Sequence, residues 1–241
     1  MQKQVITGKK QIQHIIAQLK ENWLSGRRAI FWKILREQIL EQKVKHPVLD
    51  HVGRRMAGFV EAYEQVELIE KLADEETQAG YVVAGALLET RVEKDFVAAF
   101  ALAVELIEQG NEWYVCDGMA ERVFASGLLR DHRKGVLLLE ELADNSNDWV
   151  RRAPGVAVHF AVKRGVSDEA AKALLELLQP QFGTRNFQIK KGIGLAVETI
   201  ARRHPDVARA FEGPLTDTAT NIWIRNKYAA GLKKSEGKKG E

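Results

Sequence analysis

Asp117 lies on the apolar stripe of a predicted helix, where a carboxylate is out of place. At helical spacing, one face of the segment NEWYVCDGMAERVF carries Trp113, Cys116, Asp117, Ala120 and Phe124. Burying an ionised carboxylate without a partner is strongly unfavourable. Two structural interpretations stay open: Asp117 pairs with an Arg or Lys of a neighbouring helix, or it caps the next helix. The functional interpretation is that this stripe lines an open cleft in which a negative charge is needed.

The groups that could bind a metal or do redox chemistry lack suitable spacing. Cys116 is the single cysteine, which excludes an internal disulfide framework, fits a reducing cytosol and predicts a small buried apolar side chain. No His-x3-His pair and no cysteine partner occur among the six histidines, which are His14, His46, His51, His132, His159 and His204. We therefore expect no metal site.

A basic segment, NDWVRRAPGVAVHFAVKRG (147–165), has Arg151 and Arg152 at its start and Lys163 and Arg164 at its end. One interpretation is a solvated basic face. The other is contact with phosphates, for which the guanidinium fork and permanent charge of Arg are well suited.

A second basic segment, RNFQIKKGIGLAVETIARRHPD (185–206), carries Lys190 and Lys191 one turn from its start. Gly192 and Gly194 follow no strand, so we do not expect a nucleotide-binding loop. Glycine inside a helix costs about 0.5–1 kcal/mol relative to alanine. Something therefore approaches closely here, either another helix or a nucleic-acid backbone.

The elements that must position these residues are almost all amphipathic helices with a period of 3.6 residues. The predicted helices span 8–23, 27–44, 46–63, 64–73, 76–90, 93–109, 112–126, 131–144, 148–164, 167–179, 185–203, 205–212 and 216–231. Short breaks between them predict stacked helix pairs of the HEAT-like solenoid kind. A compact irregular helical bundle is the alternative. We expect one domain over 1–231 and a flexible, basic, polar tail over 232–241.

Composition and charge narrow the class of protein. A hydrophobic fraction of 45% and a charged fraction of 29% are ordinary for a soluble protein. No stretch is apolar enough for a membrane span or a signal peptide, so we expect a cytoplasmic protein. Residues 148–241 hold 17 Lys and Arg against 10 Asp and Glu, whereas the other 147 residues hold 19 against 23. The basic C-terminal part indicates a polyanionic partner.

Together these segments resemble the AlkD-like DNA alkylation repair glycosylases, most clearly over about 78–212. The matching residues are Trp113 and Asp117 in a W-x3-D helix, Trp149, Arg152 and Lys163 in a W-x2-R-R helix, and Phe187, Ile189, Lys191, Ile193 and Gly194 in an F-x-I-x-K-x-I-G helix.

The resemblance implies a HEAT-like solenoid whose concave basic face binds duplex DNA, as a monomer and without metal or organic cofactor. It also implies hydrolysis of the N-glycosidic bond of cationic purines alkylated at N3 or N7, as a step of base excision repair. Asp117 and Trp113 would then be catalytic, and Arg152, Lys163, Lys191 and Arg151 would bind phosphates. Binding to DNA would associate a cytoplasmic protein with the nucleoid.

One position departs from the family. Its prototype has a second aromatic residue, a Trp, in the helix that matches KKGIGLAV, and Leu195 stands at the aligned position. Three hypotheses therefore remain: a glycosylase, a non-catalytic helical-repeat protein that binds DNA, and a helical-repeat scaffold for a protein partner. The scaffold would hold Asp117 in a buried structural ion pair.

Overall fold

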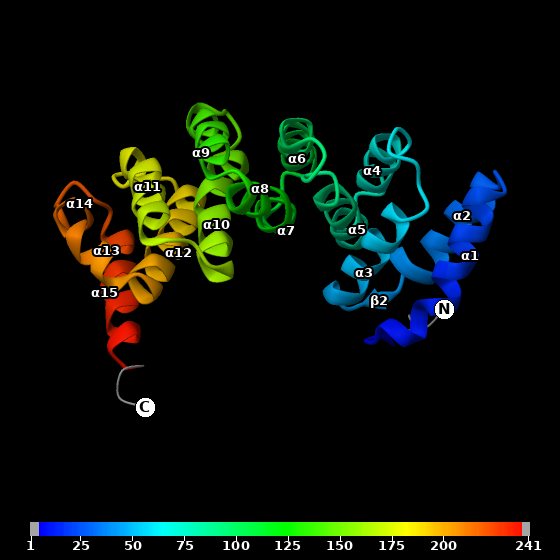
Figure 1. The fold of residues 1–241 in the computed structure, drawn as a ribbon, viewed down its shortest axis with the longest axis horizontal. Helices are drawn as coiled ribbons and strands as arrows, with labels where there is room; N and C mark the ends of the chain where they lie inside the picture. The colour runs from blue at the N-terminus through cyan, green and yellow to red at the C-terminus, as the bar shows by residue number, and fades with distance from the viewer. Residues whose placement is uncertain (1–4, 238–241) are drawn as a thin grey trace. The chain divides into compact units, whose positions relative to one another are not determined.

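The computed structural model describes residues 5–237, and their regular structure is almost entirely helical (Figure 1). The exception in this part of the chain is a parallel pair of two-residue strands, β1 (Val5–Ile6) and β2 (Lys43–Val44). The predicted all-α helical-repeat fold is confirmed. No helix in the described range is long and apolar enough to cross a membrane.

The chain divides into two compact units, Met1–Leu106 and Ile107–Glu241. The division falls within α6 (Phe96–Gly110), where the sequence has no linker. The other helices of the first unit are η1 (Lys9–Ile12), α1 (Gln13–Leu24), α2 (Arg28–Leu35), the π-helix η2 (Arg36–Leu40), α3 (His46–Ala57), α4 (Gln65–Ala73) and α5 (Gln78–Glu89).

Two predicted helices of the first unit are shorter than expected. The helix expected over 27–44 ends at Leu40, because residues 43–44 pair with β1 instead. The helix expected over 46–63 ends at Ala57, and Gln65 secures the following turn by donating from its amide to the Val60 carbonyl at 2.9 Å.

The second unit begins within α6 and continues with helices in two rows. Its elements are α7 (Trp113–Met119), the π-helix η3 (Ala120–Phe124), α8 (Ala125–Arg130), α9 (His132–Glu140), η4 (Glu141–Asp144), α10 (Asp148–Arg164), α11 (Asp168–Leu178), η5 (Gln179–Gln181), α12 (Phe187–Arg203), α13 (Pro205–Ala210), α14 (Glu212–Thr216) and α15 (Ile222–Glu236).

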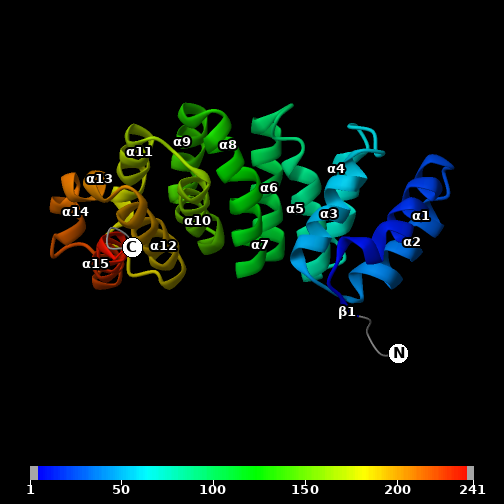
Figure 2. The same cartoon turned by 60° about the horizontal axis from the view of Figure 1, so that its bottom comes forward.

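We call α7, α10, α12 and α15 the front row, and α9, α11 and α13 the back row (Figures 1 and 2). In the front row α7 packs on α10, α10 on α12, and α12 on α15. The contacts between α10 and α12 follow the same order along both helices. Arg152 contacts Gln188 near their starts, and His159 contacts Thr199 further along. The same order holds for Asp117 with Arg152 and Glu121 with Arg164. It also holds for Gly194 with Trp223 and Ala201 with Gly231. Neighbouring front-row helices are therefore parallel, and all of them begin along one edge of the row.

The four front-row helices begin with the same short pattern of residues. The residues that precede them are Glu112, Asn147, Asn186 and Asn221. Each Asn side chain accepts hydrogen bonds from backbone N–H groups of the first turn, which satisfies donors that the helix leaves free. The third residue of each helix is a buried aliphatic side chain, namely Val115, Val150, Ile189 or Ile224. This repeat is too short and too degenerate to be recognised in the sequence alone.

The close approach predicted at the helical glycines is made by other helices. A Cβ on Gly192 would lie 2.6 Å from the Arg152 carbonyl oxygen, and one on Gly155 would overlap the Gly192 backbone. On the other side of α12, a Cβ on Gly194 would lie 2.9 Å from the Trp223 Nε1. Glycine thus permits the close packing of three parallel helices.

The C-terminus differs from the expectation of a helix over 216–231 and a tail from 232. A turn separates α14 from α15, and α15 continues to Glu236. Gly231 and Ser235 are buried on this extension, and both Lys227 and Lys234 pair with Glu198 of α12. Packing on α12 therefore orders a stretch whose polar sequence resembles a tail. The rest of the expected tail, 238–241, lies outside the described residues.

Candidate functional site

Asp117 and Arg152 form a bidentate ion pair between α7 and α10. Arg152 donates from Nε to Asp117 Oδ1 at 2.8 Å and from Nη2 to Asp117 Oδ2 at 3.0 Å. The Arg152 side chain is 11% exposed and the Asp117 side chain 28% exposed. One structural interpretation of the sequence, a partner on a neighbouring helix, is thus what the structure contains. The carboxylate nevertheless keeps access to solvent, unlike the buried pair that the scaffold hypothesis predicts.

The surroundings of Arg152 keep its guanidinium charged and fixed. Burial disfavours the charged form, but the hydrogen bonds and charge of Asp117 outweigh it, so the pKa of Arg152 is raised. Its third nitrogen, Nη1, makes one long contact, 3.5 Å to the Gln188 carbonyl oxygen of α12. Its Cζ lies 5.9 Å from the centre of the Trp149 ring. Arg152 therefore orients Asp117 and retains limited capacity for a further acceptor.

Cys116 is the buried apolar side chain that the sequence predicts. It is fully buried, and its Sγ donates to the Trp149 carbonyl oxygen at 3.1 Å. Burial and, secondarily, the charge of Asp117 raise the pKa of the Cys116 thiol. The thiol is thus a structural contact between α7 and α10.

Trp113 lies one helical turn before Asp117, as predicted, in the first turn of α7. Its indole is 55% exposed and meets the Tyr114 ring edge-on, with the ring centres 5.9 Å apart. An exposed aromatic face therefore stands on the same stripe as the carboxylate.

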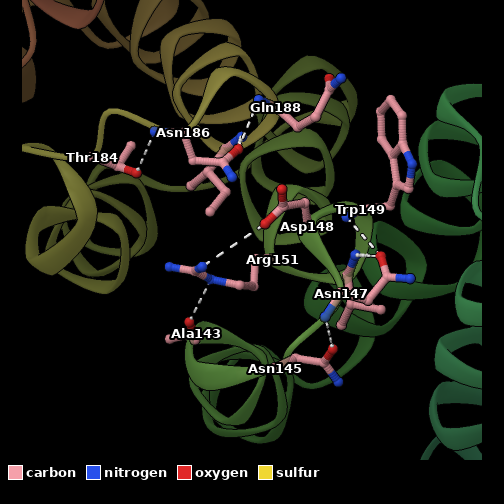
Figure 3. Close-up of polar contacts among 11 residues, drawn as sticks. Ala143, Asn145, Asn147, Asp148, Trp149, Arg151, Thr184, Asn186 and Gln188 are labelled. Atoms are coloured by element: carbon pink, nitrogen blue, oxygen red, sulfur yellow. Dashed lines mark hydrogen bonds and ion pairs between the residues drawn. The ribbon is translucent and has the colours of Figure 1, made fainter.

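Arg151, a predicted phosphate ligand, is used locally (Figure 3). Its Nε donates to the Ala143 carbonyl oxygen at 3.0 Å, and its Nη1 lies 3.9 Å from Asp148 Oδ1. The guanidinium therefore fastens the end of η4 to the first turn of α10. The structure does not bring Arg151 to the Asp117–Arg152 pair.

Lys163 and Lys191 contact aromatic rings rather than carboxylates. The Lys163 Nζ lies 5.1 Å from the centre of the Phe160 ring, and the Lys191 Nζ lies 4.2 Å from that of Phe187. Within residues 5–237 neither ammonium has an acid within ion-pair distance. Both charges remain available to an anion from outside the protein.

The site residues occupy equivalent places in successive helices. Counting from the residue before each front-row helix, the fifth position holds Asp117, Arg152, Lys191 and Asn226. The helical repeat therefore brings Asp117, Arg152 and Lys191 to the same level of the row. Residues 35 and 39 positions apart in the chain become lateral neighbours in this way. The last helix, α15, is shifted along α12, because its Gly231 faces Glu198 and Ala201.

Leu195, the position that departs from the family, lies beside a histidine that sequence reasoning missed. The Leu195 carbonyl accepts the Thr199 hydroxyl at 2.9 Å, and the Thr199 oxygen lies 2.6 Å from His159 Nδ1. Because the Thr199 proton is already used, His159 Nδ1 must donate. Burial and the nearby charges of Lys163 and Arg202 lower the pKa of His159 to about 4. No local pattern marks this contact, because its partners are 40 residues apart.

Among residues 5–237, no group of three or more His, Cys, Asp or Glu side chains is placed to hold a metal ion. A cavity of about 760 Å³ in the first unit is lined by Trp32 and by charged residues of both signs from α2, η2, α4 and the turns that follow η2 and α4. None of the predicted site residues lines this cavity.

Comparison with known proteins identifies the family. The family model described as "DNA alkylation repair enzyme" matches residues 15–224. The chain belongs to this family. Membership confirms the resemblance found in the sequence and gives the chain a role in DNA alkylation repair, with DNA as its partner.

A solved structure shares the fold of this chain. The protein smu.31 from Streptococcus mutans UA159 matches with a TM-score of 0.64 and 14% sequence identity, over 94% of this chain and 98% of that chain. At this identity the similarity concerns the fold alone. No curated protein matches the sequence.

Proposed function

We propose that this protein is a monofunctional DNA glycosylase that hydrolyses the N-glycosidic bond of cationic N3- or N7-alkylated purines in duplex DNA. The observation that carries the proposal is the bidentate Asp117–Arg152 pair, in which a partly exposed carboxylate is held in one orientation. Membership in the DNA alkylation repair family supports the same activity.

The chemistry needs a fixed negative charge and no general acid. Alkylation at N3 or N7 makes the purine a cationic leaving group, and its departure leaves an oxocarbenium-like sugar. A preoriented carboxylate stabilises such a cation or orients the attacking water. Each Asp117 oxygen accepts one bond from Arg152 and keeps a second acceptor site, since a carboxylate offers about four. Asp117 can therefore serve the sugar while it is held by Arg152.

Arg152 would in addition contact a backbone phosphate next to the damaged nucleotide. Asp117 engages the Nε–H and one N–H of Nη2, so Nη1 and the second N–H of Nη2 are the donors that remain for the phosphate. A phosphate there would draw guanidinium charge away from Asp117 and leave the carboxylate more negative toward the sugar. Binding of DNA would thus activate the pair.

Other side chains of the front-row helices would make the remaining contacts with DNA. The exposed Trp113 indole would face the sugar through cation–π contact, and Lys163 and Lys191 would bind further phosphates. Arg151 would contribute indirectly, by holding the start of α10. The proposal includes the basic concave DNA-binding face, the absence of a cofactor, the monomeric state and the cytoplasmic, nucleoid-associated location that the resemblance implies.

The test is release of 7-methylguanine and 3-methyladenine from methylated duplex DNA by the wild type and by Asp117→Asn. We expect release by the wild type and its loss in the variant, with DNA binding retained. A matched control is Glu176→Gln, which removes a charge from an exposed i,i+4 pair on α11. Equal release by wild type and Asp117→Asn would refute the catalytic role of Asp117.

Leu195 favours a second candidate function, DNA binding without base release. The aromatic wall that the family's prototype has at this position is aliphatic here. Salt-sensitive binding to DNA, without release of either methylated base by the folded wild type, would select this candidate.

A further inference from the structure

Two aromatic side chains that the proposed chemistry does not use stand exposed on adjacent front-row helices. Phe187 opens α12 and is 55% exposed, and Trp223 lies in the first turn of α15 and is 39% exposed. Because α12 and α15 are parallel, both rings lie toward the edge of the row at which the front-row helices begin. Trp223 lies against Gly194, seven residues after Phe187 on α12. Phe187 is the first residue of α12 and Trp223 the second residue of α15. Two exposed aromatic rings at the starts of adjacent helices call for an explanation.

The surroundings of the two rings are cationic. Lys191 and Lys190 place their Nζ atoms 4.2 Å and 5.6 Å from the centre of the Phe187 ring, and the Lys227 Nζ lies 5.5 Å from that of Trp223. The first two turns of these helices, 187–194 and 222–229, contain four Lys or Arg residues and no acid.

Only one of these four cations has an acidic partner in the described part of the chain. Lys227 contacts Glu198, which lies further along α12. Arg225 has a buried Nε without a hydrogen-bond partner among residues 5–237. This surface therefore offers positive charge that the protein itself does not neutralise.

The Trp223 ring is held in place by the backbone of α12. A Cβ on Gly194 would lie 2.9 Å and 3.0 Å from Nε1 and Cδ1 of the indole, and 3.1 Å from the Lys227 Cγ. Glycine at this position lets one edge of the indole lie against the helix while the rest faces solvent. The ring is thus fixed before any ligand arrives.

We propose that Phe187 and Trp223, with the lysines beside them, form a stacking platform for unpaired bases of DNA. The proposal rests on the proposed function, because it assigns this surface to the DNA that flanks the nucleotide at Asp117. Exposed aromatic rings interleaved with cations are the general means by which proteins bind single strands: bases stack on the rings and phosphates meet the cations. In an intact duplex the base faces are covered by their neighbours, so rings of this kind have nothing to stack on.

The spacing of the helices fits a flanking tract. Packed helices lie about 8–10 Å apart, and stacked nucleotides rise about 3.4 Å along one strand. Phe187 is one helix and Trp223 two helices beyond Arg152, so the rings correspond to nucleotides roughly three and five positions from the phosphate at Arg152. The platform would favour damage beside a single-stranded tract over damage within an intact duplex.

The experiment measures fluorescence anisotropy with a blunt duplex and with the same duplex carrying a single-stranded thymine arm. The test variants are Phe187→Leu and Trp223→Leu, which remove a ring but keep apolar volume. Their matched partners, Phe187→Tyr and Trp223→Phe, keep a ring. Ile222→Ala is the surface control, because Ile222 is 58% exposed on the same turn as Trp223.

We expect the wild type to bind the armed duplex more tightly than the blunt one. Each Leu variant should bind the armed duplex roughly 5- to 150-fold more weakly and the blunt duplex within about twofold of wild type, since stacking needs an unpaired base. The ring-keeping variants and Ile222→Ala should behave as wild type. Any of three results would refute the platform. The wild type could bind both duplexes with equal affinity, or the Leu and ring-keeping variants could bind the armed duplex equally well. The Leu variants could also lose as much affinity for the blunt duplex as for the armed one.

Base release by the wild type is measured separately, so the two proposals can fail independently. Preference for the armed duplex without base release would leave the platform standing and remove the glycosylase. Base release without any preference for the armed duplex would support the glycosylase and refute the platform.

Discussion

At the scale of single residues, the geometry of Arg152 matters more than its charge. Its planar fork fixes both Asp117 oxygens at once, which a single ammonium group does not do. We predict that Arg152→Lys slows base release by about 10- to 100-fold, because small displacements of a reacting group have effects of that size. Single-turnover kinetics on methylated duplex would measure the change.

The control for this prediction is Arg209→Lys, because Arg209 pairs with the exposed Asp206 and Glu236 on the surface. The double variant Arg152→Lys, Asp117→Asn should release bases no more slowly than Asp117→Asn alone, since Arg152 and Asp117 act as a unit. Additive losses would show that Arg152 acts independently of Asp117.

His159 gives the stability of the protein a predictable pH dependence. Its pKa is lowered to about 4 in the fold, first by burial and then by Lys163 and Arg202, while the charge of Asp117 acts in the opposite direction. The ordinary pKa is about 6.5, so between these values the unfolded chain binds a proton that the native chain does not. The contribution of His159 to stability is therefore complete above pH 6.5 and is lost as the pH falls toward about 4.

We predict that His159→Gln flattens the dependence of the unfolding free energy on pH in this window. Urea denaturation of wild type and variant at a series of pH values would measure it. Parallel pH curves for the two proteins would contradict the assignment. His51→Gln is a useful comparison, because the pKa of His51 is also lowered by burial but it lies in the first unit, next to Lys9, Arg55 and Arg54.

The candidate site could be predicted from the sequence to the extent that its signals are local. Asp117 is recognisable because a carboxylate interrupts an apolar stripe, and Arg152 because it follows a cap and a tryptophan. That these two residues pair is not recognisable, since their contact depends on how α7 and α10 align. The same reason hides the contact of His159 with Thr199 and the contact of Arg151 with the Ala143 carbonyl.

At the scale of elements, the crossing of α10 and α12 depends on glycine. We predict that Gly192→Ala lowers the unfolding free energy by about 1–3 kcal/mol, although alanine favours helix by about 1 kcal/mol. The reason is that the added Cβ would lie 2.6 Å from the Arg152 carbonyl oxygen. Chemical denaturation would measure the loss.

The matched control is Gly213→Ala in α14, where an added Cβ would meet no atom within 4 Å. This substitution should be neutral or stabilising by up to about 1 kcal/mol. Equal effects at Gly192 and Gly213 would mean that helix propensity, and not the close crossing, decides both.

Helices were predictable where their ends carry strong local signals. α10 spans the predicted 148–164, since Asn147 caps its start and Gly165, with φ of 111°, ends it. Prediction failed where a distant partner decides the structure. The strand at 43–44 needs β1, and the extension of α15 past residue 231 needs the surface of α12. Neither partner is visible within the segment itself.

At the scale of the whole molecule, the uneven distribution of charge is expected to govern DNA binding. The basic excess lies in 148–241, which includes Lys163 and Lys191. We predict that Lys163→Ala and Lys191→Ala each reduce the slope of log affinity against log salt by about one, because each phosphate contact releases about one counterion. Lys172→Ala, which removes a lysine paired with Glu176 on α11, should leave the slope unchanged. An unchanged slope in all three variants would place the DNA elsewhere.

The burial of Cys116 has a consequence for the conditions in which a DNA alkylation repair enzyme works. Reagents that methylate purines also methylate cysteine, and the thiolate is the form that reacts. The chain's single cysteine is adjacent to Asp117, fully buried, and has a raised pKa, so it keeps its proton at neutral pH. Iodoacetamide should therefore modify the unfolded chain and spare the native one. We expect the native protein to resist, at the residue beside its carboxylate, the reagents whose damage its family repairs.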